Sequence, residues 1–217
     1  METGRGQHLG NEINDTISMC CRVEHGLTPV PKERMGAVCG YCKKRSAHSP
    51  LHFITCQAAR KAKMWIRHFQ VVWLIASYAR VAGIPLTVEP KHLQDKSNKR
   101  PDIDMFVRLM RKLVDVTIRC SAGKSDPDSA FEAAENEKSR KYAQMARECG
   151  ADIVTLAFDA FGGWSNQSSK FLDDLRRVRA INPEANEAFK RLKQEISCAI
   201  HRANGKALQE ASRAFNE

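Results

Sequence analysis

Apolar residues in the middle of the chain recur first with a helical period and then in short runs typical of strands. From Ala58 they return every third or fourth residue, which predicts one long helix that ends at Gly83. Three short runs follow, each bounded by turn residues, at 84–90, 102–108 and 112–120. We therefore expect a helix followed by three strands.

The second half of the chain alternates in the same way. A polar loop precedes a helical segment that Gly150 closes and that Asp128 or Ser129 could cap. The next segment, "ADIVTLAF" (151–158), is a continuous apolar run typical of a strand buried on both faces. Two or more amphipathic helices should follow it. This order of elements predicts an α/β domain.

The composition favours a globular protein. Of the 217 residues 42% are hydrophobic, which is enough for a core. The longest apolar run, "VVWLIA" (71–76), is too short to cross a bilayer, and the start "METGRGQHLG" lacks the hydrophobic core of a signal peptide. We expect a soluble protein that is not secreted.

The charge of the chain favours a polyanionic partner. Thirty-five Lys and Arg against 25 Asp and Glu give a net charge of +10. The segment from Arg60 to Lys112 has twelve basic and four acidic residues, so +8 of this charge is concentrated there. The alternative is a charged face that only meets solvent.

The eight cysteines, without a signal peptide, favour thiols or a metal site over a disulfide framework. Residues 39–56, "CGYCKKRSAHSPLHFITC", contain the pattern C-x2-C-x9-H-x3-C. Two pairs with short internal spacing can bind one tetrahedral zinc through Cys39, Cys42, His52 and Cys56. His48 competes with His52, but the one-turn spacing to Cys56 favours His52. The alternative is a set of reduced cysteines in a core.

Two acids interrupt the apolar strands. Asp102 opens the second strand and Asp115 lies in the middle of the third. Burying an acid is costly unless it is paired or binds a metal. A tight hairpin could bring both carboxylates to the same end of the sheet, where they could share Mg²⁺. The alternative is a salt-bridged sheet in which the acids pair with Arg100, Arg111 or Lys112.

The chain carries four motifs in order: "CGYC…HFITC", "RPD" (100–102), "VDVT" (114–117) and "KSRKY" (138–142). This combination resembles the PD-(D/E)XK nuclease superfamily. Within it, it is most similar to the restriction-like endonuclease region, with an upstream CCHC zinc knuckle, at the C-terminus of site-specific non-LTR retrotransposon proteins. The resemblance covers about residues 39–164. The chain departs from that family in its knuckle spacing and in "RHF" (67–69), a variant of a basic-His-Asn tripeptide, which leaves the role of His68 open.

The resemblance implies a mixed four-stranded sheet flanked by helices and a site for Mg²⁺ or Mn²⁺ at Asp102 and Asp115. Thr117 stands where a D-x-K motif has its lysine, and the family moves that lysine to the next helix. The resemblance therefore implies that Lys138 and Lys141 act near the scissile phosphate. These two lysines are three residues apart on a helix, and hence on one face.

Other residues receive smaller roles. Glu89 is a candidate additional ligand, although an ordinary strand-end acid is the favoured interpretation, and Tyr142 is expected to pack. Six basic residues are candidates for contact with nucleic acid: Lys43, Lys44, Arg45, Arg67, Lys99 and Arg100. We expect a loosely ordered lead over 1–36, the knuckle over 37–60, the endonuclease core over 61–165 and a helical extension over 166–217.

These features predict a Mg²⁺-dependent endonuclease that hydrolyses phosphodiester bonds in duplex DNA, most simply by nicking one strand. By resemblance it would act in the nucleus. The rival hypothesis is a catalytically inactive protein that keeps the fold and binds DNA or RNA, or serves assembly. A third, a protein–protein module built on the helices from Glu184 onward, is compatible with either.

Overall fold

The computed structural model of the protein describes residues 39, 42–43, 51–56, 65–94, 99–121, 126–178 and 183–213. The predicted lead over 1–36 lies outside this part of the chain, as do Lys44, Arg45 and His48. Among the helices described, none combines the length and the hydropathy that a bilayer span requires.

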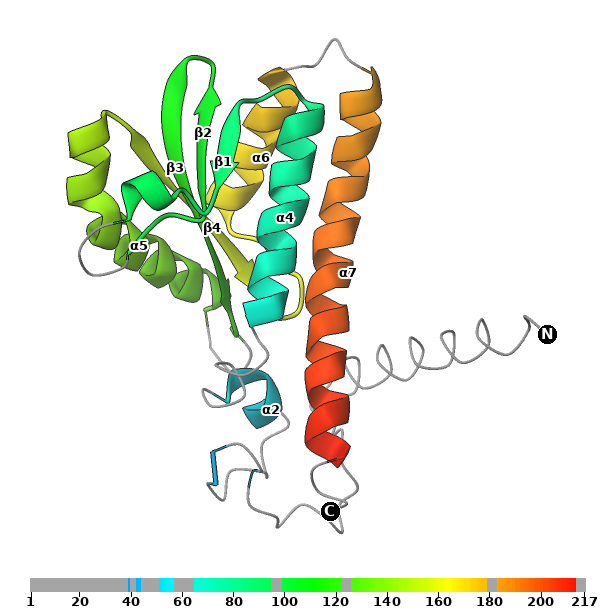
Figure 1. The fold of residues 1–217 in the computed structure, drawn as a ribbon. Helices are drawn as coiled ribbons and strands as arrows, with labels where there is room; N and C mark the ends of the chain where they lie inside the picture. Colours follow the sequence, from blue (N-terminus) through cyan, green and yellow to red (C-terminus); the bar gives the residue numbers. More distant parts are fainter. Residues whose placement is uncertain are drawn as a thin grey trace. The chain divides into compact units, whose positions relative to one another are not determined.

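The described strands form one four-stranded sheet in the order β1 (Leu86–Val88), β2 (Ile103–Val107), β3 (Met110–Arg119) and β4 (Asp152–Asp159). The first three strands pair antiparallel, whereas β3 and β4 are parallel (Figure 1). The predicted α/β class and the mixed four-stranded sheet are therefore confirmed.

Helices account for most of the remaining described chain: α2 (His52–Thr55), α4 (Trp65–Val81), α5 (Pro127–Cys149), α6 (Asn166–Val178) and α7 (Pro183–Arg213), with a short 3₁₀ turn, η3 (Lys91–Leu93). Parallel strands need a crossover connection, and α5 provides it between β3 and β4. The predicted strands are all present, and the long central helix is present over its described part, Trp65–Val81, while the predicted start at Ala58 lies outside the described residues.

The two ends of α5 show how the sequence sets its length. The side chain of Asp126 accepts a hydrogen bond from the Asp128 backbone N–H, and proline occupies the first helical position. The predicted cap at Asp128 or Ser129 is thus wrong, because Pro127 lacks an N–H and fits the first turn, which moves the cap one residue before it. Gly150, at φ 61°, closes the helix as predicted.

The register of β2 and β3 places the two predicted acids on one face. Ile103 pairs with Val114 and Asp104 with Leu113. Because side chains alternate along a strand and directly opposed residues share a face, Asp102 and Asp115 point to the same side of the sheet. This side is the one that α5 meets, through contacts of its side chains with Asp115.

The chain divides into two compact units, one of Met1–Arg67 with Cys198–Glu217 and one of His68–Ser197. The second unit contains the whole sheet, α5 and α6. Its core is built from buried aliphatic and aromatic side chains, among them Ile75, Met105, Leu113 and Leu156. The first unit contains the cysteine–histidine segment.

Candidate catalytic cluster and candidate metal centre

The two predicted acids are held at the junction of β2 and β3. Asp102 precedes β2, and its Oδ2 accepts a hydrogen bond of 2.6 Å from the Val116 backbone N–H. Its own N–H donates to the Val114 carbonyl at 3.0 Å. Asp115 lies inside β3 with only 2% of its surface exposed. The hairpin thus fixes both carboxyl groups through backbone pairing.

Helix α5 brings two side chains to Asp115 from positions one helical turn apart. Lys138 Nζ lies 2.6 Å from Asp115 Oδ2, and the Tyr142 hydroxyl lies 2.6 Å from Asp115 Oδ1. The Lys138 contact is an ion pair of poor alignment, since the buried Oδ2 has no hydrogen bond of standard geometry. Tyr142 also lies 2.6 Å from the Arg100 carbonyl oxygen, and its single proton serves one of these acceptors at a time.

The surroundings of Asp115 favour its protonated form. Burial raises the pKa of the carboxyl, and the negative charge of Asp102 raises it further. Lys138 and Tyr142 lower the pKa, but their effect is the smaller one. The anionic form of Asp115 is therefore less stable than that of an ordinary exposed acid, even with Lys138 beside it.

His68, near the start of α4, contacts the other acid. Its Nε2 lies 3.1 Å from Asp102 Oδ2 and 3.0 Å from the Val116 carbonyl oxygen. Both neighbours are acceptors, so this nitrogen carries a proton. Burial alone would lower the pKa of His68, but the hydrogen bond to Asp102 and the charges of Asp102 and Asp115 outweigh it, and the pKa is raised.

Lys141 completes the group on α5. Its Nζ donates to the Tyr142 hydroxyl at 2.6 Å and lies 4.4 Å from the centroid of the same ring. Burial and then the positive charge of Lys138 lower the pKa of Lys141. The structure thus brings all four predicted site residues, Asp102, Asp115, Lys138 and Lys141, into one neighbourhood.

The cations that could have paired with the two acids lie against other carboxylates. Arg111 makes two hydrogen bonds to Asp104, of 2.9 and 2.7 Å, and Lys112 lies 2.6 Å from Asp152. Arg100 pairs with Glu89. The salt-bridge alternative is therefore wrong in the partners it named, and the favoured interpretation of Glu89 as an ordinary acid agrees with its pairing.

The predicted nucleic-acid contacts are placed unevenly. Lys43 and Lys99 are exposed, and Arg100 is half-buried. Arg67, in contrast, is 5% exposed, and its Nη1 donates to Asn204 Oδ1 at 2.6 Å. We had expected Arg67 to face nucleic acid, but its guanidinium is used inside its own unit, and this assignment is corrected.

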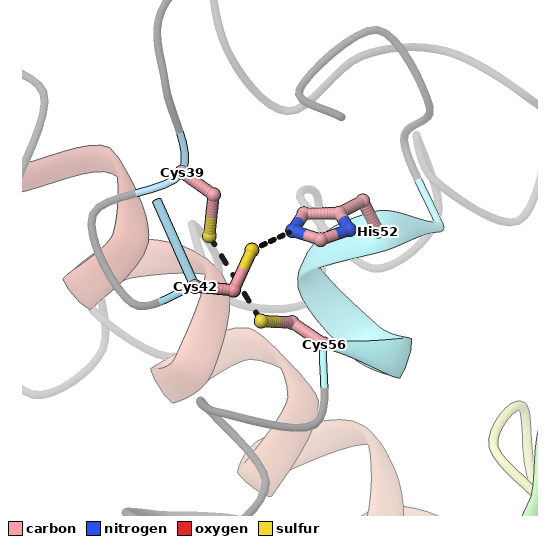
Figure 2. A group of neighbouring side chains, drawn as sticks. All are labelled: Cys39, Cys42, His52 and Cys56. Atoms are coloured by element: carbon pink, nitrogen blue, oxygen red, sulfur yellow. Dashed lines mark hydrogen bonds between the residues drawn. The ribbon is translucent and has the colours of Figure 1, made fainter. Parts of the chain in front are cut away.

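The four predicted ligands of the knuckle converge in the first unit (Figure 2). A backbone bond from Lys43 N–H to the Cys39 carbonyl closes the knuckle turn, with Lys43 in the left-handed region at φ 58°. The single turn of α2 carries His52 at its start and is followed directly by Cys56. One Sγ or ring nitrogen from each of Cys39, Cys42, His52 and Cys56 lies within 4.8 Å of the others.

The separations inside this cluster match a tetrahedral ion. Cys39 Sγ and Cys56 Sγ are 3.9 Å apart, and Cys42 Sγ lies 3.5 Å from His52 Nε2. Around zinc, with bonds of about 2.3 Å to sulfur and 2.0–2.1 Å to nitrogen, two sulfurs lie about 3.8 Å apart and sulfur and nitrogen about 3.5–3.6 Å. A disulfide would need about 2.05 Å. The cluster can therefore hold a metal such as zinc.

Two residues of the candidate catalytic cluster have contacts that the sequence did not predict. Tyr142 was expected only to pack, yet its hydroxyl joins Asp115, Arg100 and Lys141. The sequence leaves the role of His68 open, and the structure shows that it contacts Asp102. The signals were present in "KSRKY" and "RHF", but only the fold shows which of their side chains reach the acids.

Comparison with known proteins adds no assignment. No protein-family model matches the chain, and no curated protein matches it.

Proposed function

We propose that the protein is a metal-dependent DNA endonuclease with a PD-(D/E)XK-like core that hydrolyses phosphodiester bonds and nicks duplex DNA. One observation carries this proposal. A lysine on the crossover helix reaches the buried acid of the central strand, where Lys138 Nζ lies 2.6 Å from Asp115 Oδ2. The lysine that the D-V-T strand lacks is supplied in space by the helix that follows it.

The oxygen atoms at this site fit a hard divalent cation. Asp115 Oδ2 is buried without a well-aligned hydrogen bond, and the Val116 carbonyl and Asp102 Oδ2 both lie close to His68 Nε2. Carboxylates and backbone carbonyls are the ligands that Mg²⁺ and Mn²⁺ take. Asp102, Asp115 and the Val116 carbonyl would hold the cation, which would polarise a phosphate oxygen and lower the pKa of a bound water.

Four side chains of the cluster have separate roles beside the cation. Lys138 neutralises charge that develops at the phosphate and orients the attacking water. Lys141, whose pKa is lowered, exchanges a proton more readily than an ordinary lysine and is the better candidate for general acid–base assistance. Tyr142 holds the Asp115 carboxyl, and His68 holds that of Asp102.

We assign the cysteine–histidine cluster to structural zinc. Four protein ligands leave no open position, which is typical of structural sites rather than catalytic ones. The metal would stabilise the short α2 turn, which makes few hydrogen bonds of its own. Lys43 on the knuckle turn is exposed and would lie against a DNA phosphate.

One observation favours the rival function, nucleic-acid binding without catalysis. Lys138 faces Asp115 and His68 faces Asp102, so the cluster can balance both acids without a metal. A protein that had lost catalysis would have this arrangement at rest. The two functions therefore differ in whether a divalent cation displaces these contacts.

The experiment is nicking of supercoiled plasmid in Mg²⁺ or Mn²⁺ by the native protein, Asp115→Asn and Asp152→Asn. The control replaces an exposed acid of the same sheet, which pairs with Lys112 rather than with the cluster. We expect nicking by the native protein and the control, and loss of nicking with retained DNA binding in Asp115→Asn. No nicking by the native protein on plasmids that it binds would establish the binding function instead.

A further inference from the structure

The turn between β2 and β3 has an unusual backbone for its sequence. Its two residues are Arg108 and Leu109, at φ 50° and 66°. A two-residue hairpin turn with both residues in the left-handed region ordinarily takes Gly, Asn or Asp, because a larger side chain is strained there. Strain of this kind is retained where the side chain has a use.

The same turn presents apolar side chains to solvent. Leu109 is 98% exposed, Met110 52% and Phe106 48%. Arg111 lies across the hairpin from Phe106, with its guanidinium carbon 5.9 Å from the ring centroid. The tip is therefore a small convex group of apolar side chains beside basic ones. Exposed apolar groups of this kind mark a contact surface.

The hairpin tip is joined rigidly to the catalytic cluster. Asp102 directly precedes β2, and Leu109 follows the other end of that strand, while Asp115 lies within β3. The six residues between them span roughly 20 Å at about 3.3 Å per residue. That is roughly six base pairs at the 3.4 Å rise of B-DNA.

The chemistry of the tip fits duplex DNA. Leu, Met and Phe are among the side chains that wedge between base pairs, and a two-stranded ribbon fits a DNA groove. Arg108, exposed and without an ion-pair partner among the described residues, stands beside Leu109 to meet a phosphate. Three side chains on a tight turn are too few for a stable protein–protein interface, which needs about 800 Å² per partner.

We propose that Leu109, flanked by Met110, is a wedge that enters duplex DNA and unstacks one base step about six base pairs from the scissile phosphate, with Arg108 on the adjacent backbone. The inference rests on the proposed function in taking DNA as the substrate. Unstacking would bend the duplex and bring the distant phosphate into the catalytic cluster.

The test uses the full chain and duplexes with 2-aminopurine at successive steps on either side of the nick, whose fluorescence rises on unstacking. The variant is Leu109→Asn, because asparagine accepts the left-handed backbone and removes only the apolar wedge. The control is Val81→Asn, which replaces an apolar residue 54% exposed at the end of α4. We expect the native protein and the control to raise the fluorescence several-fold at one step, and Leu109→Asn to leave it near that of free duplex.

Nicking of the same duplexes separates this inference from the proposed function. We expect slower nicking by Leu109→Asn and its recovery on a duplex with an abasic site at that step, because the step is already unstacked. Nicking without any fluorescence change would overturn the wedge and leave the endonuclease intact. The wedge would also be overturned if the sole effect of Leu109→Asn were a loss of self-association or a loss of binding to anionic vesicles. Absence of duplex binding by the native protein would overturn both.

Discussion

Replacement of Tyr142 by phenylalanine should lower the stability of the protein markedly, although it removes a single oxygen. The hydroxyl is buried, with the residue 1% exposed, and lies 2.6 Å from both Asp115 Oδ1 and the Arg100 carbonyl. In Tyr142→Phe the ring still fills its space, so no cavity forms. The carbonyl and the carboxyl, however, lose the single hydroxyl proton that serves one of them at a time.

The magnitude follows from one hydrogen bond, because the hydroxyl has a single proton. A buried hydrogen bond between neutral groups contributes about 1 kcal/mol, and one to a charged group about 1.5–3 kcal/mol. Losing it should reduce the free energy of unfolding by about 1–3 kcal/mol. The measurement is urea unfolding followed by the fluorescence of the three tryptophans, at constant zinc and without added divalent cation.

Tyr78 offers a matched control within the same unit. It is 4% exposed and packs its ring on Phe189, but its buried hydroxyl has no hydrogen-bond partner in the described structure. Tyr78→Phe should therefore leave the urea midpoint unchanged or raise it slightly. Equal effects of the two substitutions, or a loss below about 0.5 kcal/mol in Tyr142→Phe, would refute the role given to the Tyr142 hydroxyl.

Three further predictions concern the metal, pH and the hairpin. Cys56→Ser should lose bound zinc by elemental analysis, and removing zinc with a chelator should lower the melting temperature of the native protein but not of the variant. Because the folded-state pKa of Asp115 is raised, the native state holds its proton longer than the unfolded state, so stability should fall as pH rises from about 4 through the raised pKa. Asp115→Asn should remove that fall in urea midpoints measured without divalent cation; an identical pH dependence would contradict the assignment. Leu109→Gly should raise stability by about 0.5–1 kcal/mol, because glycine accepts φ 66° without strain, and an unchanged melting temperature would refute the strain.

The sequence predicted those features that depend on local patterns. Alternating and continuous apolar runs located β2, β3 and β4, and the left-handed preference of Gly150 located the end of α5. The candidate metal ligands follow from short spacings, because the one-turn spacing of His52 and Cys56 needs no tertiary information. The two acids were recognisable because a carboxyl group in a buried strand requires compensation.

What the sequence left out depends on packing between distant segments. The contact of His68 with Asp102 and that of Tyr142 with Asp115 form only when α4 and α5 pack against the β2–β3 hairpin. The prediction that Arg67 is exposed was wrong. A basic residue near other basic residues is usually exposed, but Asn204, far along the chain, supplies a buried acceptor for Arg67. A charge count cannot identify such a partner.

The central claim is that Lys138 and Asp115 act as one catalytic unit, and a double-mutant cycle of nicking rates tests it most directly. The native protein, Asp115→Asn, Lys138→Met and the double variant are compared on one supercoiled plasmid at saturating Mg²⁺. When two residues act as a unit in catalysis, removing either one slows the reaction about as much as removing both. We predict that each single variant loses about 10²–10⁴-fold in rate and that the double variant loses no more. The account would be contradicted if the rate loss of the double variant equalled the product of the two single losses. It would also be contradicted if Lys138→Met nicked at the native rate.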